Sequence, residues 1–243
     1  MIDIHSHVLP GIDDGSRNIQ MSLAMLKEAK KQGIDLMFFT PHFYADETDP
    51  KRFIERRGLA ASALQESIEA NEGDYPSYLL GSEVHYYRGI GRSEDIASLC
   101  MGSSRYLLLE PPFRSWTPAF LDDVRELRDE QDLKVIIAHI ERYLDQDKHL
   151  VAELLSEPGI YIQANAESFL ERRTRRQALK MLESGKISFL GSDCHNLDDR
   201  CPNLASAREL IEDKLGGAVL TRIDENSRQL VQEASGGKEV HVL

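Results

Sequence analysis

Two histidines near the start of the chain have a spacing that suits metal binding. His5 and His7 follow isoleucines that alternate with polar residues, which is the period-two pattern of a β-strand. On such a strand both imidazoles point to the same side. Neutral imidazoles that converge in this way, beside the carboxylates of Asp13 and Asp14, are the ligands that a divalent metal ion needs.

Other apolar, β-rich runs end in residues of the same chemical type. Seven strands are predicted, at Ile2–His5, Asp35–Thr40, Tyr78–Val84, Tyr106–Glu110, Lys134–His139, Ile160–Ala164 and Ser188–Asp193. A single histidine or glutamate at the end of a strand is more often a cap or a surface group. Here, however, six of the seven strands place such a residue at the same end.

The complete set of ligand-type side chains is too large for one ion. It comprises His5, His7, Asp14, His42, Glu83, Glu110, His139, Asp193 and His195. Five imidazoles and four carboxylates indicate a cluster of two or three ions with a bridging carboxylate.

Helical segments that separate the strands would bring these ligands together. Helices are predicted at Ser16–Lys31, Pro50–Asn71, Ala119–Gln131, Asp145–Leu155, Glu171–Ser184, Leu204–Leu215 and Thr221–Ser235, with a loop at Asn165–Leu170. Regular strand–helix alternation predicts a parallel sheet, and seven such units suggest a closed or nearly closed α/β barrel. In such a barrel functional side chains collect at the carboxyl ends of the strands. Residues 1–243 are expected to form a single domain, with a flexible tail from about residue 236.

Composition excludes several classes of protein. A formal charge of −12 argues against the nucleic-acid backbone as a partner, because basic surfaces supply that affinity. No apolar run is long enough to cross a bilayer, and the chain shows no signal peptide. The three cysteines give no even disulfide framework, so a cytoplasmic protein is expected. Oligomeric state is left open by the sequence.

The ordered motifs resemble those of the polymerase-and-histidinol-phosphatase (PHP) superfamily. The matching motifs are His5-Ser6-His7, Thr40-Pro41-His42, Gly81-Ser82-Glu83, His139 and Gly191-Ser192-Asp193-x-His195. The strings DIHSHVLPGIDDG at 3–15 and AHIERY at 138–143 are similar to the bacterial capsule-type tyrosine phosphatase branch of that superfamily. The resemblance extends to about Leu215. It implies a distorted (β/α)7 barrel of the PHP type with a trinuclear site.

The resemblance also implies how the ligands are shared among three ions. The implied groups are His5, His7, Glu83 and Asp193; Glu83, Glu110 and His139; and Asp14, His42 and His195. The site is usually supported by manganese (Mn2+) in this superfamily. Iron and zinc would also fit oxygen and imidazole ligands without thiolate.

Such a site is suited to the hydrolysis of phosphate esters. Bound ions lower the pKa of water to about 7, which gives a hydroxide nucleophile at neutral pH. Tyrosine phenolate, with a parent pKa of about 10, is a comparatively good leaving group. Arg142 and Arg200 follow His139 and His195 and match basic positions of the family, so they are candidate catalytic residues that clamp phosphate through two hydrogen bonds. The alternative for both arginines is an ordinary surface salt bridge.

The segment from Cys194 to Arg200 offers a rival mechanism. It has the C-x5-R spacing of cysteine-dependent tyrosine phosphatases, which need a thiolate of low pKa. This segment lacks glycine, and Asp198 and Asp199 would repel phosphate and raise the thiol pKa. The match is interpreted as a coincidence.

The leading hypothesis is therefore a metal-dependent protein-tyrosine phosphatase. By resemblance its substrate would be the tyrosine-rich C-terminal tail of a bacterial kinase that controls capsule or exopolysaccharide synthesis. Histidinol phosphate or another small phosphomonoester is the alternative substrate, and a metal-binding regulatory partner without turnover is the alternative class. The acidic charge argues against the nuclease activity of the superfamily.

The remaining histidines and aromatic residues carry weaker expectations. His85, His149 and His241 are expected to be surface groups. Four aromatic residues in loops either stack on an incoming tyrosine ring or cover the barrel end; these are Phe43, Tyr44, Phe113 and Trp116.

Overall fold

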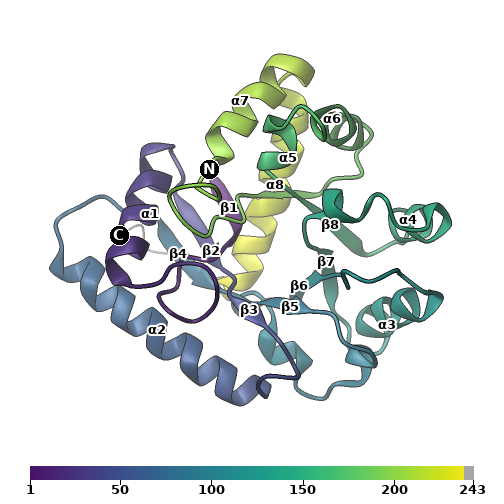
Figure 1. Ribbon diagram of the computed structural model, residues 1–243, viewed down its shortest axis with the longest axis horizontal. Coiled ribbons are helices and arrows are strands. Elements are labelled where there is room, and N and C mark those ends of the chain that lie inside the picture. Colours follow the sequence, from purple (N-terminus) through teal and green to yellow (C-terminus); the bar gives the residue numbers. More distant parts are fainter. Residues whose placement is uncertain (238–243) are drawn as a thin grey trace.

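The computed structural model describes residues 1–237, and its centre is a curled sheet of parallel strands with helices outside it (Figure 1). The strands are β1 (Ile2–Ser6), β2 (Leu36–Phe39), β3 (His42–Phe43), β4 (Ser77–Leu80), β5 (Glu83–His85), β6 (Tyr106–Glu110), β7 (Lys134–Ile137), β8 (Ile160–Asn165) and β9 (Phe189–Gly191). Their hydrogen-bonded order is β1-β2-β4 in one part and β3-β5-β6-β7-β8-β9 in the other. Each of these pairings is parallel, as predicted.

The prediction of a continuous strand over Tyr78–Val84 is wrong, and a short strand that was not predicted, β3, follows β2. Gly81 and Ser82 separate β4 from β5, and Thr40 and Pro41 separate β2 from β3. Pro41 cannot donate a hydrogen bond to a ladder, which breaks the pairing at this level. Pairing resumes beyond the break with His42 directly opposite Glu83. The interruption therefore places two ligand-type residues side by side.

The first and last strands meet and complete the curl of the sheet. The His7 amide donates to the carbonyl of Cys194 at 2.9 Å, and the Asp193 amide donates to the carbonyl of His5 at 2.8 Å. Ser6 and Cys194 form an isolated parallel bridge. These contacts follow the ends of β1 and β9, so the sheet has the curvature expected of a distorted barrel.

The helices occupy the predicted places with changes at their ends. They are α1 (Ile19–Lys31), α2 (Pro50–Ala70), α3 (Pro118–Asp129), α4 (Lys148–Leu154), α5 (Glu167–Leu170), α6 (Arg175–Glu183), α7 (Leu204–Leu215) and α8 (Gly217–Ala234). Helix α1 begins after Asn18 and not at Ser16, because the Asn18 side chain accepts a hydrogen bond from the Met21 amide. The loop predicted at Asn165–Leu170 contains the short helix α5, and α6 begins later than expected.

Alternation along the strands divides the apolar core into two clusters. In β6, Leu107 and Leu109 pack in the cluster that includes residues of the outer helices, such as Leu26 of α1 and Leu127 of α3. Tyr106 and Leu108 pack in a second cluster together with side chains of α8. Figure 1 shows α8 passing behind the middle of the curled sheet. Contacts of α8 with Lys134 at the start of β7 and with Ser188 just before β9 place the helix over the amino ends of these strands.

Among residues 1–237, no helix is long and apolar enough to cross a membrane. Most of the tail expected to be flexible, residues 238–243 with His241, lies outside the described residues.

Candidate metal centre

The nine predicted ligands lie at the carboxyl ends of the strands. Three compact groups are formed, in each of which one ligand atom per residue lies within 4.8 Å of all the others. The groups are His5, His7, Glu83 and Asp193; His7, Asp14, His42 and His195; and His42, Glu83 and Glu110. Seven of the nine residues are buried, His42 is nearly so, and Asp14 is exposed at the edge.

Glu83 is the central residue of the cluster. Its Oε2 atom lies 3.1 Å from His5 Nε2, 3.2 Å from His7 Nε2 and 3.1 Å from His42 Nδ1. Its other oxygen, Oε1, lies 2.7 Å from His139 Nε2. One carboxylate thus faces four imidazoles from three segments of the chain, which is the position expected of a bridging ligand between ions.

The grouping differs in part from the one that the family resemblance implies. The group of His5, His7, Glu83 and Asp193 is the same in both. His42 joins Glu83 and Glu110 in the structure, where His139 was expected. His139 nevertheless contacts both carboxylates, at 2.7 Å from Glu83 and 3.5 Å from Glu110.

Buried ligand atoms without hydrogen-bond partners show that these residues fit metal ions. Among the described residues, Glu83 Oε2, His139 Nδ1, Asp193 Oδ1 and His195 Nε2 are buried and have no hydrogen-bond partner. A buried polar atom without a partner costs about 1–3 kcal/mol. Three of these four atoms belong to the close contacts of the cluster, where divalent ions would satisfy oxygen and imidazole donors.

The two central carboxylates are ionised. Burial opposes the ionisation of Glu83, but the imidazoles of His5, His42 and His139 outweigh it and hold the pKa of Glu83 well below its usual value. Burial also opposes the ionisation of Asp193, and neighbouring histidines again keep its pKa well below the usual range. Both groups therefore present negative charge to a cation at neutral pH.

Two of the ligand-type residues have an unusual backbone. His139 has a φ of 29° and Asp193 a φ of 53°, in the left-handed region that non-glycine residues rarely adopt. Each lies two residues beyond the end of a strand, and each donates its backbone amide to a neighbouring strand, His139 to Gln163 and Asp193 to His5. Such strain is typical of functional sites, because the surrounding structure must maintain it.

Asp13 supports the ligands, although the sequence singled out its neighbour Asp14. Its carboxylate lies 2.7 Å from His7 Nδ1 and accepts a hydrogen bond from the His42 amide at 3.1 Å. Burial opposes ionisation of Asp13, but His7 lowers its pKa to about 2. An anionic partner on Nδ1 leaves Nε2 of His7 directed at the cluster, which is the usual arrangement behind a metal-binding histidine.

Arg142 and Arg200 both reach the cluster from the outer side. Arg142 donates from Nη2 to Asp193 Oδ2 at 2.6 Å, and Arg200 donates to the same oxygen at 2.9 Å. Their side chains are about one-third exposed, at 35% and 30%. Two guanidinium groups therefore converge on one carboxylate at the edge of the centre, where part of each remains accessible.

The prediction that His85 is a surface group without a partner is wrong. His85 Nδ1 lies 2.8 Å from Glu110 Oε2, and its ring contacts those of Tyr44 and Phe113 at centroid distances of 5.4 and 5.6 Å. A signal was available in the sequence, because His85 and Glu83 are two residues apart and therefore face the same side of β5.

The four loop aromatics divide into two pairs. Phe43 and Trp116 are buried in the core, so they cover the barrel end. Tyr44 and Phe113 flank His85 instead, and Phe113 is 65% exposed. This second pair can offer a ring face to a ligand.

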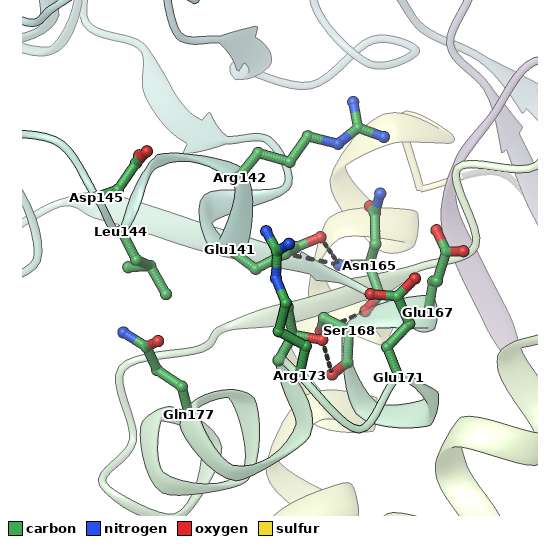
Figure 2. Close-up of a pocket in the computed structure, with 11 residues that line it drawn as sticks. Glu141, Arg142, Leu144, Asp145, Asn165, Glu167, Ser168, Glu171, Arg173 and Gln177 are labelled. Atoms are coloured by element: carbon green, nitrogen blue, oxygen red, sulfur yellow. Dashed lines mark hydrogen bonds between the residues drawn. The ribbon is translucent and has the colours of Figure 1, made fainter.

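A cavity of about 490 Å³ opens beside the cluster (Figure 2). It is formed by the 3-10 turn Ile140–Tyr143, the end of β8, helix α5 and the start of α6. Arg142 and Asn165 line it, and both also donate hydrogen bonds to Asp193 Oδ2. The figure shows Glu167 and Glu171 on one side of the cavity and Asp145 on the other. Arg142 and Asn165 therefore contact both the cavity and Asp193 of the ligand cluster.

Known proteins resemble the chain over nearly its full length. A family model described as capsular polysaccharide synthesis, CpsB/CapC, matches residues 1–232. The tyrosine-protein phosphatase CpsB of Streptococcus agalactiae serotype V is 28% identical over 227 residues, covering 87% of this chain and 89% of the relative. The tyrosine-protein phosphatase YwqE of Bacillus subtilis strain 168 is 27% identical over 245 residues, covering 96% of this chain and 92% of the relative.

The fold agrees with these relatives. A solved structure from work on YwqE of Bacillus subtilis and CpsB of Streptococcus pneumoniae, described as unique metal-dependent tyrosine phosphatases, matches with a TM-score of 0.78. The match has 26% identity and covers 96% of this chain and 95% of that chain. The resemblance to capsule-type tyrosine phosphatases, inferred from the motifs, is confirmed. The chain belongs to the CpsB/CapC family of capsular polysaccharide synthesis.

Proposed function

We propose that this chain is a metal-dependent protein-tyrosine phosphatase with two or three divalent ions, manganese in the first place, at the cluster around Glu83. The observation that carries the proposal is that imidazoles and carboxylates converge on one place. Several of their buried nitrogen and oxygen atoms have no hydrogen-bond partner there. The tyrosine phosphatase activity named for the relatives supports the choice of reaction. The ligands are those predicted: His5, His7, Asp14, His42, Glu83, Glu110, His139, Asp193 and His195.

The chain's own side chains would hold and orient the phosphoryl group. When bound, divalent ions would activate water and neutralise phosphate oxygens at neutral pH. Arg142 and Arg200 lie at the edge with partly exposed guanidinium groups, so each can exchange its contact with Asp193 for a phosphate oxygen. Tyr44 and Phe113 would contact the phenyl ring of the substrate. These groups bind and orient the ester, and we propose no further general acid, since phenolate leaves readily.

The proposed substrate is a flexible polypeptide segment, the tyrosine-rich tail of a capsule-controlling bacterial kinase. A cavity of about 490 Å³ next to the phosphate clamp offers room for residues that flank the phosphotyrosine. An extended tail can enter such a site without the unfolding of a folded partner. The capsule-synthesis family of the chain supports this choice.

We further infer a (β/α)7 barrel of the PHP type and a cytoplasmic location. If the interrupted pairs β2/β3 and β4/β5 each count as one strand, the strands form seven units around the curl, and β9 meets β1. The three cysteines are free thiols, which suits a reducing compartment.

Removal of metal is expected to abolish hydrolysis of a phosphotyrosine peptide. Chelation followed by dialysis should eliminate turnover, and addition of Mn2+ should restore it, because the ligands by themselves provide no activated water. Initial rates would be measured by phosphate release. Turnover of histidinol phosphate without turnover of the peptide would instead support the small-molecule alternative. Activity that is indifferent to chelation would contradict the metal-dependent mechanism.

A Cys194→Ser variant is expected to retain its activity. The Cys194 side chain is buried in the apolar core, and burial raises the pKa of its thiol to about 12, so almost no thiolate exists at neutral pH. The kcat and KM of the variant on the same peptide would be compared with those of the unaltered chain. A loss as large as that caused by a ligand substitution would revive the C-x5-R mechanism.

A further inference from the structure

Strand β8 was the one predicted strand without a metal ligand, yet it ends beside the cluster. Its last residues include two amides, Gln163 and Asn165, whose side chains are 0% and 3% exposed. Burial of two amides in this position costs free energy unless each polar atom has a partner. Their partners are residues of the proposed metal centre.

The two amides form a hydrogen-bonded chain that connects three strands. The His139 amide donates to Gln163 Oε1 at 2.6 Å. Gln163 Nε2 then donates to Asn165 Oδ1 at 2.9 Å, and Asn165 Nδ2 donates to Asp193 Oδ2 at 2.8 Å. The chain therefore begins at the backbone of one ligand and ends at the carboxylate of another.

The orientation of both amides is fixed by the groups at the two ends. A backbone N–H can only donate, so the Gln163 atom that faces it must be the oxygen. An ionised carboxylate can only accept, so the Asn165 atom that faces Asp193 must be the nitrogen. Rotation of either amide by half a turn would bring two acceptors or two donors together.

This fixed orientation determines which nitrogen of His5 carries the proton. Gln163 Oε1 also lies 3.3 Å from His5 Nδ1. An oxygen in this place pairs with Nδ1 only when Nδ1 bears hydrogen, and then Nε2 of the neutral ring has a free lone pair. His5 Nε2 is the atom that faces Glu83 and Asp193 in the cluster.

We propose that Gln163 and Asn165 are positioning residues that set the tautomer of His5 and the orientation of Asp193 for metal binding. The proposal rests on the proposed metal centre and adds residues to it that touch no ion themselves. Outer partners of this kind contribute about 10- to 100-fold to metal affinity. The ion held by His5, His7, Glu83 and Asp193 is the one that depends on them.

The test uses apolar replacements of similar shape in the full chain. Gln163→Met and Asn165→Leu remove the hydrogen bonds and keep most of the volume. Gln32→Met and Asn226→Leu are matched controls, because these amides donate to backbone carbonyls outside the centre, at 2.7 and 2.9 Å. Gln163→Glu retains an oxygen for the His139 amide and for His5 Nδ1 but loses the donor to Asn165, so it separates the effect on His5 from the effect on Asn165. Circular dichroism would identify the folded variants.

Two readouts distinguish positioning from a general effect on the fold. Binding of Mn2+ alone would be titrated by calorimetry, and both apolar variants should lose about 10- to 100-fold in affinity for one ion, whereas the controls should not. Proton and nitrogen NMR of the chain loaded with diamagnetic Zn2+ would report the Nδ1 proton of His5. That proton should be hydrogen-bonded and exchange slowly with water in the unaltered chain and in Gln163→Glu, but not in Gln163→Met.

Failure of the proposed metal centre can be distinguished from failure of the positioning role. An unaltered chain that binds no Mn2+ would refute the metal centre itself. An unaltered chain that binds Mn2+, with folded Gln163→Met and Asn165→Leu variants that bind it equally well, would refute the positioning role alone. If Gln163→Met does not fold, Asn165→Leu and Gln163→Glu still decide the matter, because normal affinity in the first or rapid exchange of the His5 Nδ1 proton in the second would overturn the proposal.

Discussion

Replacement of Asp193 with alanine is expected to abolish phosphotyrosine hydrolysis, with a loss in kcat/KM of at least about 10³-fold. Asp193 Oδ1 lies 3.6 Å from His5 Nε2 and 3.3 Å from His7 Nε2, so the substitution removes an anionic ligand from the centre. Its Oδ2 atom accepts from both Arg142 and Arg200, so the phosphate clamp loses its anchor at the same time. Two parts of the site therefore fail together.

The Asp193→Ala substitution should lower the catalytic rate without unfolding the protein. Initial rates with saturating Mn2+ and the thermal unfolding midpoint would be measured for Asp193→Ala and for Asp213→Ala. Asp213 is exposed on α7 and pairs with its exposed neighbour Lys214, so its replacement should leave both quantities unchanged. A folded Asp193→Ala variant with near-normal activity would show that the ion at this position is dispensable.

Gly191→Ala is expected to disrupt the centre although glycine carries no functional group. A methyl group at residue 191 would lie 2.6 Å from the Cβ of His5 and 3.1 Å from Gln163 Nε2. Neither neighbour can move freely, because His5 lies on a buried strand and Gln163 is held at both ends by hydrogen bonds. Overpacking of this kind costs about 1–3 kcal/mol, and here the displaced residue is a proposed metal ligand. Mn2+ affinity and the free energy of unfolding should therefore fall together.

Gly58→Ala supplies a control with the same chemical change. Gly58 lies within α2, and a methyl group there would meet nothing within 4 Å. Alanine is the better helix former by about 0.5–1 kcal/mol, so this variant should gain stability and retain metal affinity. Urea unfolding with and without Mn2+ would measure both effects. A Gly191→Ala variant that behaves like Gly58→Ala would show that the strand tolerates the larger residue.

The clustering of the proposed ligands was predictable because their position along the chain follows from a simple rule. In a parallel sheet every strand runs the same way, so a polar residue just after an apolar run reaches the same end as its counterparts. His5, Glu110 and His139 satisfy this rule directly. The close approach of His42 to Glu83 was not predictable, since it depends on interruptions of two strands at the same level.

The supporting residues lacked any such signal. Gln163 and Asn165 are neutral amides in a strand with no ligand, and their function depends on partners from β1, from the end of β7 and from the loop after β9. Asp3 is similar, because it is buried between the amides of His5 and Ser192, which are distant in sequence. The role of such side chains can be recognised only when the three-dimensional arrangement of the strands is known.

The meeting of the first and last strands also determines when the centre can form during folding. The Ser192 amide donates to Asp3 across 189 residues of sequence. Closure of so long a loop has a high entropic cost, and contacts of this range form late in folding. His5 and His7 therefore have no complete set of ligands until nearly the whole chain has been synthesised and the sheet has curled. In the proposed centre, metal ions would bind tightly only to the finished structure, so their binding energy would stabilise the protein as a whole.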